Sequence, residues 1–364
     1  MASVEEYRAA GLYNPAENAD DRLALLHWLE QQGFSIGDMV EADRYDRLLS
    51  LAGDRRLLLG DARRSRREAI EQSGMEPAVF DEVVIALGFV PFDDDEITFS
   101  DADIATVAAI GSLAVMFSPD EALSLIRVYG SSFARLGEAT NTLYLADIEA
   151  DLTQLDGTEL EFARNAYEAV GLLDGFTSLL DPVLRRHIYQ ATERIRRATI
   201  DESNRVFFFA VGFIDLAGYT EYSGSLPPDE LDQFIQQFER DAYRTTTECD
   251  ARLVKLIGDA VMFVAPEIGA ACAAASALID RFGGAAPDVS PRGGLAYGQV
   301  LVRGGDYYGP IVNLASRLVD AAVPGEILVN EAVVEAIDTP GRFEPAGRRA
   351  VKGFRDPVRV WSLN

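Results

Sequence analysis

One stretch constrains the fold of this chain more than any other: residues 205–220, with the sequence RVFFFAVGFIDLAGYT. It begins as a continuous apolar run and ends on Asp215, shortly before Gly218. A run of Val, Phe and Ile that is bounded by a glycine-containing turn predicts a buried β-strand. A carboxylate at the end of such a strand is costly unless it leaves the core or meets a cation.

A second unit of the same kind follows at residues 251–264, ARLVKLIGDAVMFV. Two short strands flank the turn Ile257-Gly258-Asp259, which predicts a hairpin with Asp259 at its tip. Carboxylates at the ends of two hydrophobic strands suit a hard divalent cation with oxygen ligands. The alternative is that both are solvated turn aspartates.

The remaining C-terminal residues alternate between strand and helix signals. Pro227 and Pro228 open a long helix, and residues 292–304 (RGGLAYGQVLVRG) read as a hairpin of two strands. Further helices are predicted over residues 267–282 and 310–322. The order strand, helix, strand, strand, helix, strand is the ferredoxin-like βαββαβ plan, which places Asp215 and Asp259 side by side. Such a pair could hold two metal ions.

Three strings in this half, FIDLAGYT, KLIGDAV and DYYGPIVNLASRL, resemble the signatures of class III nucleotidyl cyclases. The resemblance covers about residues 204–363. It implies an enzyme that converts ATP to 3′,5′-cyclic AMP and pyrophosphate as a homodimer with sites shared between the two chains. The whole chain also resembles soluble mycobacterial adenylyl cyclases, in which a helical autoregulatory, pH-sensing domain precedes the catalytic domain.

The resemblance also assigns roles to residues. Asp215 and Asp259 would bind two Mg²⁺ or Mn²⁺ ions. The backbone at Leu216, Gly218 and Thr220 would contact phosphate oxygens. Lys352, in the string AVKGF, matches a family lysine that contacts the triphosphate.

Asn313 and Arg317 are four residues apart on a predicted helix and therefore share one side of it. By the resemblance, Asn313 would orient the ribose and Arg317 would stabilise the charge on the five-coordinate phosphorus. An arginine on a helix surface is the alternative for Arg317.

Lys255 and Asp306 are the expected base-recognition pair. Adenine offers an acceptor at N1 and a donor at its amino group, so a lysine and an aspartate complement it. Guanine presents the opposite pattern, and guanylyl cyclases of the family usually carry Glu and Cys at these places.

Three other functions compete with this hypothesis, and the first, a DNA-binding regulator built on the N-terminal half, is opposed by the acidic charge of the chain. A diguanylate cyclase is suggested by Gly304-Gly305-Asp306, but Tyr307 and Tyr308 follow where that family has Glu-Phe. A non-catalytic ATP-binding sensor is opposed by the complete set of six catalytic side chains.

Residues 1–183 read as helices with almost no β-type alternation. We therefore predict an α+β protein with an all-helical regulatory domain at residues 1–183, a linker helix at 184–203 and a catalytic domain at 204–364. The apolar helix at residues 104–117 would belong to the core, and could also line a pocket for a fatty acid.

The linker helix is basic and contains His187, a residue type that titrates near neutral pH. It could transmit a regulatory signal, or be a linker whose basic face meets acidic neighbours. His187 is the regulatory candidate, against the simpler view that it is a surface residue.

The formal net charge of −26 argues against binding to nucleic acid and to anionic membranes. The two cysteines, Cys249 and Cys272, have neither zinc-site nor disulfide spacing. No stretch resembles a signal peptide or a transmembrane helix, so we expect a cytoplasmic protein.

Overall fold

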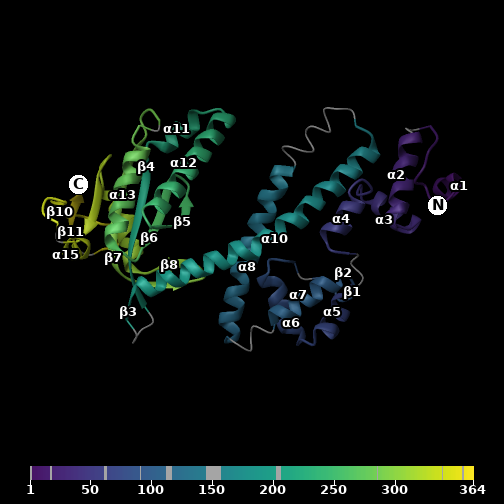
Figure 1. Cartoon of the computed structure of the whole chain (residues 1–364), viewed down its shortest axis with the longest axis horizontal. Coiled ribbons are helices and arrows are strands. Elements are labelled where there is room, and N and C mark those ends of the chain that lie inside the picture. Colours follow the sequence, from purple (N-terminus) through teal and green to yellow (C-terminus); the bar gives the residue numbers. More distant parts are fainter. Residues whose placement is uncertain are drawn as a thin grey trace. The chain divides into compact units, whose positions relative to one another are not determined.

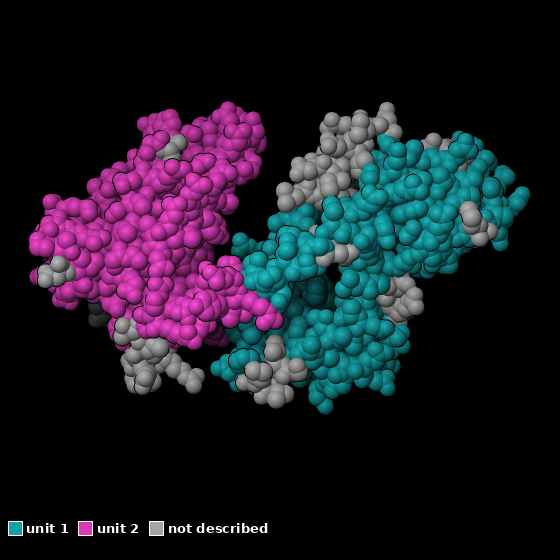
Figure 2. Space-filling view, viewed as in Figure 1, with its two compact units in different colours: residues 1–183 teal, residues 184–364 magenta. Residues whose placement is uncertain are grey.

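The computed structural model describes residues 2–16, 19–60, 64–90, 92–111, 117–144, 157–201, 206–284, 286–337, 339–354 and 356–364. The chain divides into two compact units, Met1–Val183 and Leu184–Asn364 (Figure 2). Within the described residues, no helix has both the length and the apolar character needed to cross a bilayer.

The first unit is built from short helices. In chain order these are α1 (Val4–Ala9), α2 (Ala19–Gln31), α3 (Ile36–Arg44), α4 (Leu51–Leu57), α5 (Arg66–Ser73), α6 (Pro77–Ala86), α7 (Asp101–Gly111) and α8 (Pro119–Tyr144). Many begin with a serine or threonine whose hydroxyl accepts from a backbone N–H three residues on, while the acid at that position accepts from the cap. This reciprocal capping satisfies amide groups that a helix start leaves unpaired. It occurs at Ser3, Ser35, Ser65, Ser100, Ser118 and Thr158.

The helical prediction for this unit is confirmed, with one addition. A two-stranded antiparallel sheet joins β1 (Arg64–Ser65) to β2 (Ile97–Phe99). Strands of two and three residues are too short to produce a period-two pattern, so the sequence pattern does not predict them.

The predicted apolar helix at residues 104–117 is observed only in part. α7 ends at Gly111, and residues 112–116 lie outside the described part of the chain. Ile104 and Val107 are buried in a cluster with Phe80, Phe99 and Ile126. The described part of this helix therefore packs in the core through one face.

One long helix, α10 (Glu159–Arg197), runs across the predicted boundary at residue 183, with Pro182 in its interior. The predicted linker helix at 184–203 is thus the C-terminal part of α10, and it ends at Arg197 rather than at residue 203. Thr199–Asp201 form strand β3 instead. The reason is tertiary pairing, because these residues hydrogen-bond to the next strand along the chain, opposite Phe207 and Phe208.

The second unit is a sheet covered by helices (Figure 1). Its long strands are β4 (Val206–Ala217), β5 (Arg252–Ile257), β6 (Ala260–Ala265), β7 (Ser290–Arg303), β9 (Ile327–Asn330), β10 (Phe343–Arg349) and β11 (Val358–Leu363). The sheet order is β10-β11-β9-β7-β4-β6-β5, while β3 pairs with β4 and β8 (Asp306–Tyr308) pairs with β7. Its helices are α11 (Tyr219–Ser225), α12 (Pro228–Glu248), α13 (Ile268–Phe282), α14 (Pro310–Ala321) and α15 (Glu331–Ala336).

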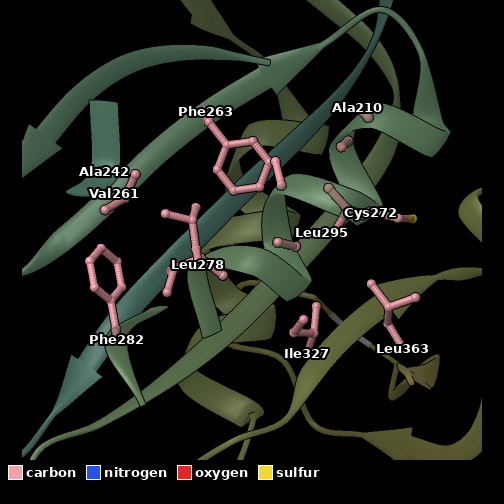
Figure 3. Packing of buried hydrophobic residues seen from close by; sticks show 14 of the residues in the cluster. Ala210, Ala242, Val261, Phe263, Cys272, Leu278, Phe282, Leu295, Ile327 and Leu363 are labelled. Carbon is pink, nitrogen blue, oxygen red and sulfur yellow. The ribbon is translucent and has the colours of Figure 1, made fainter. Parts of the chain in front are cut away.

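The four strands in the order β7-β4-β6-β5, with α12 and α13 as the two helical connections, make the expected βαββαβ arrangement. Strand β4 lies between β7 and β6 and is buried on both faces. Ala210 and Ile214 belong to one buried cluster with Ala242 of α12 and with Leu278 and Phe282 of α13. Figure 3 shows Ala210, Ala242, Leu278 and Phe282 of this cluster. The alternate residues, including Phe209, pack with α14. Because both faces are covered, the β4 sequence is continuously apolar rather than alternating.

The prediction of a hairpin within residues 292–304 is wrong. The segment belongs to one 14-residue strand, β7, and the turn comes after it, at Gly304-Gly305. Gly293 and Gly294 are strand residues at which neighbouring atoms approach closely. A Cβ atom on Gly294 would lie 2.3 Å from the carbonyl oxygen of Ala315 and 2.7 Å from the backbone nitrogen of Val319. Gly294 therefore lets α14 approach the sheet, whereas a Cβ atom on Gly293 would meet the side chains of Ile214 and Ile327.

Gly294→Ala should consequently destabilise the second unit by about 2–3 kcal/mol, because the added methyl group meets helix backbone that cannot turn aside. The measurement is urea or thermal unfolding of the full chain. Gly269→Ala in α13 is the matched control, because a Cβ atom at that position would have no heavy atom within 4 Å. Equal stability of the two variants would contradict this account of the β7–α14 contact.

Candidate active site

Asp215 and Asp259 are brought together by strand pairing. In the antiparallel ladder between β4 and β6, Asp215 lies opposite Ala260, the residue after Asp259. The β5–β6 turn at Gly258, with a φ of +61°, places Asp259 beside the end of β4. The predicted meeting of two strand-end carboxylates is therefore observed.

The two carboxylates differ in their surroundings: Asp259 is partly desolvated, whereas Asp215 pairs with an arginine. Burial raises the pKa of the Asp259 carboxyl above its usual range, and the nearby Asp215 charge acts in the same direction. Asp215 forms an ion pair with Arg292, whose Nη2 and Nε donate to its Oδ2 at 2.8 and 3.1 Å. Arg292 acts on the pKa of Asp259 in the lowering direction, which shows that all three groups share one electrostatic environment. A divalent cation would offset the cost of holding two carboxylates together.

These donors fit magnesium or manganese. Among the described residues, no group of three or more His, Cys, Asp or Glu side chains could form a complete metal cage. Mg²⁺ is commonly held by one or two carboxylates, with substrate phosphates and water completing the octahedron. Asp215 and Asp259 meet that requirement, and they offer no nitrogen or sulfur ligand that would favour zinc.

Leu216, Gly218 and Thr220 lie where β4 passes into α11: Leu216 near the end of the strand, Gly218 at the N-cap of the helix and Thr220 in its first turn. Leu216 is buried in the core, while Gly218 and Thr220 are exposed at the start of α11. Gly218 has a φ of +90°, and a Cβ atom there would lie 2.3 Å from the carbonyl oxygen of Asp288. A side chain at this position would therefore be strained and would clash with the neighbouring loop.

Aromatic contacts hold α11 against α12. The ring of Phe234 in α12 stacks on Tyr219 at a centroid distance of 5.8 Å and meets Tyr222 edge-on at 5.4 Å. Ring pairs of this geometry add packing energy beyond their buried area. These contacts with α12 hold α11 in place, and with it the segment that contains Gly218 and Thr220.

Lys255 and Asp306 form an ion pair between β5 and β8. Asp306 is placed by the tight β7–β8 turn, in which Gly304 and Gly305 have φ values of +59° and +78°. Two consecutive positive φ angles are typical of a type I′ hairpin. The second carboxylate oxygen of Asp306 accepts from the backbone N–H of Tyr307 at 2.8 Å. The predicted base-recognition residues are therefore in direct contact.

Asn313 and Arg317 lie on the side of α14 that faces away from the core, whereas Leu314 and Leu318 are buried beneath the helix. Arg317 pairs with Asp320 within the same helix at 3.1 Å. No hydrogen bond or ion pair links Asn313, Arg317 or the Lys255–Asp306 pair to Asp215 or Asp259 among the described side chains.

The other two predicted residues are both exposed. Lys352 is exposed, in the turn between β10 and β11 that begins at the buried Val351. His187 is exposed on α10.

Sequence reasoning missed Arg292. The hairpin predicted at residues 292–304 conceals it, because that hairpin makes Arg292 the start of a separate strand pair. In fact β7 runs antiparallel to β4 with Arg292 directly opposite Asp215. A cationic residue at the start of a strand next to the acidic end of β4 is the signal that could have identified it.

Comparisons with known proteins agree with this architecture. Residues 8–190 match the family model described as "Adenylate cyclase regulatory domain". The uncharacterized protein Rv2212 of Mycobacterium tuberculosis is 34% identical over 98% of this chain and 93% of its own length. A protein named adenylate cyclase from Glutamicibacter nicotianae is 28% identical over 98% of this chain and 92% of its own length. The protein named pH-sensitive adenylate cyclase MT1302, from Mycobacterium tuberculosis (strain CDC 1551 / Oshkosh), is 29% identical over 94% of this chain and 88% of its own length.

Among solved structures, the adenylyl cyclase CyaB from P. aeruginosa covers 43% of this chain and 93% of its own, with 26% identity and a TM-score of 0.39. The family assignment rests on the sequence matches, which extend over both units. The chain belongs to the family of adenylate cyclases that carry this N-terminal regulatory domain.

Proposed function

We propose that this protein is an adenylyl cyclase that converts ATP to 3′,5′-cyclic AMP and pyrophosphate. The observation that carries the proposal is the pair Asp215 and Asp259 at one sheet edge, in the same chain as the lysine–aspartate contact between Lys255 and Asp306. Relatives that match along most of the chain are named adenylate cyclase, which supports the same reaction.

The proposed chemistry is attack of the ribose 3′-hydroxyl on the α-phosphorus, with pyrophosphate as the leaving group. Bound Mg²⁺ or Mn²⁺ ions would supply Lewis acidity at the hydroxyl and at the phosphates. Asp215 and Asp259 would hold the two ions. Arg317 would stabilise the negative charge that grows on the phosphorus oxygens, and Asn313 would orient the ribose.

The remaining residues would bind the substrate. Backbone groups at Leu216, Gly218 and Thr220 would contact phosphate oxygens, and Lys352 would contact the triphosphate. Arg292 is a cation already beside Asp215, so we add it to the groups that would meet the phosphates.

For the base, we infer recognition of adenine by Lys255 and Asp306. An ammonium group donates to N1 of adenine, and a carboxylate accepts from its amino group. The two side chains pair with each other in this structure, so neither charge is left without a partner before the nucleotide arrives.

We further propose that the site is completed by a second copy of the chain. Lys255 and Asp259 are four residues apart on one hairpin, yet the base and the α-phosphate lie on opposite sides of the ribose. One copy would give Asp215 and Asp259, and the other would give Lys255, Asp306 and the α14 residues. A two-fold axis would generate two equivalent sites.

The helical region would regulate this activity. The match to a regulatory-domain model supports the proposal, and the name of one relative suggests pH as an input. A fatty acid in the helical region is a second candidate input. His187 on α10 is the proposed regulatory residue.

The experiment is incubation of the purified full-length chain with ATP and Mn²⁺ or Mg²⁺. We expect equimolar cyclic AMP and pyrophosphate, and little cyclic GMP from GTP. A chain that binds ATP but forms no product would be a sensor. Formation of cyclic di-GMP or cyclic GMP from GTP, without cyclic AMP from ATP, would identify one of the competing activities.

A further inference from the structure

The last turn of α10 is attached to the strand that carries Asp306, and all the contacts lie within the unit Leu184–Asn364. The attachment has a polar part around Tyr307 and an apolar part around Ala198. Neither part includes a residue assigned above to the metal ions, the phosphates or the base. Its position beside the base-recognition pair is what links it to catalysis.

Tyr307 is the centre of the polar part. Only 4% of its surface is exposed, and its ring meets Phe209 of β4 edge-on at a centroid distance of 5.2 Å. Its backbone N–H donates to Asp306 at 2.8 Å. Any displacement of Tyr307 therefore moves the carboxylate that pairs with Lys255.

Two arginines interact with the side chain of Tyr307. The Nη1 atom of Arg252, at the start of β5, lies 3.5 Å from its hydroxyl oxygen, and Nη2 donates to the carbonyl oxygen of Gly305 at 3.0 Å. Arg194, near the end of α10, interacts with the same tyrosine, which acts to raise the pKa of Arg194 against the lowering caused by burial. The two guanidinium groups repel each other, since burial and then the charge of Arg252 lower the pKa of Arg194. The Tyr307 oxygen accepts from Arg252, and the same neutral side chain interacts with Arg194.

The neighbouring arginine of α10 makes a second link to the sheet. Arg197 is engaged by Asp250, with contacts of 2.5 and 3.2 Å to its two carboxylate oxygens. Asp250 precedes β5, the strand that carries both Arg252 and Lys255. The end of α10 thus contacts the two strands that supply the base-recognition pair, through Arg194 to β8 and through Arg197 to the start of β5.

The apolar part fixes the same turn. Ala198 is 6% exposed and belongs to one buried cluster with Phe209, Tyr307 and Leu314, against which Ile195 also packs. Strand β3 then continues the chain alongside β4. The end of α10 is therefore part of this core and can move only if the core moves with it.

We propose that Tyr307 is a positioning residue for base recognition, and that the last turn of α10 sets the affinity for ATP by holding Tyr307 through Arg194. This inference rests on the proposed cyclase function, since it assigns Lys255 and Asp306 to the base. A change in α10 would therefore alter the binding of the base, through Tyr307, and would leave the binding of the metal ions unchanged.

The test uses Tyr307→Phe and Arg194→Gln in the full-length chain. Each removes a polar interaction of Tyr307 with an arginine and keeps the ring packed on Phe209. We expect the KM for ATP to rise about three- to ten-fold, with kcat within about two-fold, because one polar interaction with a charged group is lost. Inhibition by inorganic tripolyphosphate, which has no base, should stay at the wild-type value.

Two variants serve as controls. Tyr297→Phe removes a hydroxyl from another tyrosine whose ring packs on its neighbour Phe208. Arg196→Gln removes an exposed arginine of α10 that pairs with Glu193 on the same helix. Both should keep the wild-type KM.

Three results would overturn the inference: weaker tripolyphosphate inhibition in parallel with the KM, a fall in kcat with an unchanged KM, or a shift in Tyr307→Phe without one in Arg194→Gln. Failure of the cyclase proposal is seen separately, as absence of cyclic AMP from the wild-type chain. In that case the dissociation constant for ATP, measured by equilibrium dialysis on the same variants, still tests the link from α10 to Tyr307.

Discussion

Chains that carry Asp259→Ala or Arg317→Ala are expected to form cyclic AMP about 10²- to 10⁵-fold more slowly than the wild type, the range found for lost charge-stabilising groups in phosphoryl transfer. Asp259→Ala removes one of the two carboxylates at the metal-binding edge. Arg317→Ala removes the cation that would meet charge present only in the transition state. We therefore expect kcat to fall in both variants.

The measurement is cyclic AMP formation at saturating ATP and metal, with unfolding curves to establish that each variant folds. Matched controls are Asp280→Ala, an exposed carboxylate of α13, and Arg359→Ala, an exposed arginine that pairs with Glu331. Both controls should stay within about two-fold of the wild type, as is usual for surface positions. Near-normal activity in Asp259→Ala would rule out the assigned metal site.

The double substitution Lys255→Glu with Asp306→Cys is expected to lower kcat/KM for ATP by about 10²-fold or more, because polar groups that were built to pair with the base are left unmatched. Glutamate accepts where adenine N1 also accepts, and cysteine no longer provides the carboxylate for the amino group. The same change matches guanine better, so the ratio of GTP to ATP use should rise.

Kinetics with both nucleotides measure this effect. Arg303→Glu is the control for charge reversal, because Arg303 lies opposite Asp306 in the same hairpin. It should preserve the preference for ATP. If the double variant also retains full selectivity for ATP, Lys255 and Asp306 do not read the base.

Much of the second unit could be predicted because its signals are local. An apolar run predicts strand β4, a glycine turn predicts the hairpin with Asp259, and a proline predicts the start of helix α14. Asp215 and Asp259 could be placed together because the order of these local signals matches the βαββαβ plan, in which β4 pairs with β6.

The remaining features depend on contacts between distant residues. Gly294 has the sequence character of a turn glycine, and its role follows only from the packing of α14 against it. The contribution of Arg292 to the site depends on its pairing with Asp215, which lies 77 positions earlier in the chain. Arg194 and Tyr307 are unremarkable as sequence, and only the packing of α10 on this unit brings them together. Helix α10 itself continues through Pro182, where local rules predict an interruption.

The most direct test of the shared-site cyclase is cyclic AMP formation after mixing Asp259→Ala and Arg317→Ala chains under conditions of proven subunit exchange. A mixed dimer would contain one doubly damaged site and one intact site. Random exchange makes about half of the dimers mixed, so about a quarter of wild-type activity should return. Mixing Asp259→Ala with Asp215→Ala should restore nothing, because both changes damage the same side of the site. If the Asp259→Ala and Arg317→Ala mixture also stays inactive, the catalytic site is not shared between two chains.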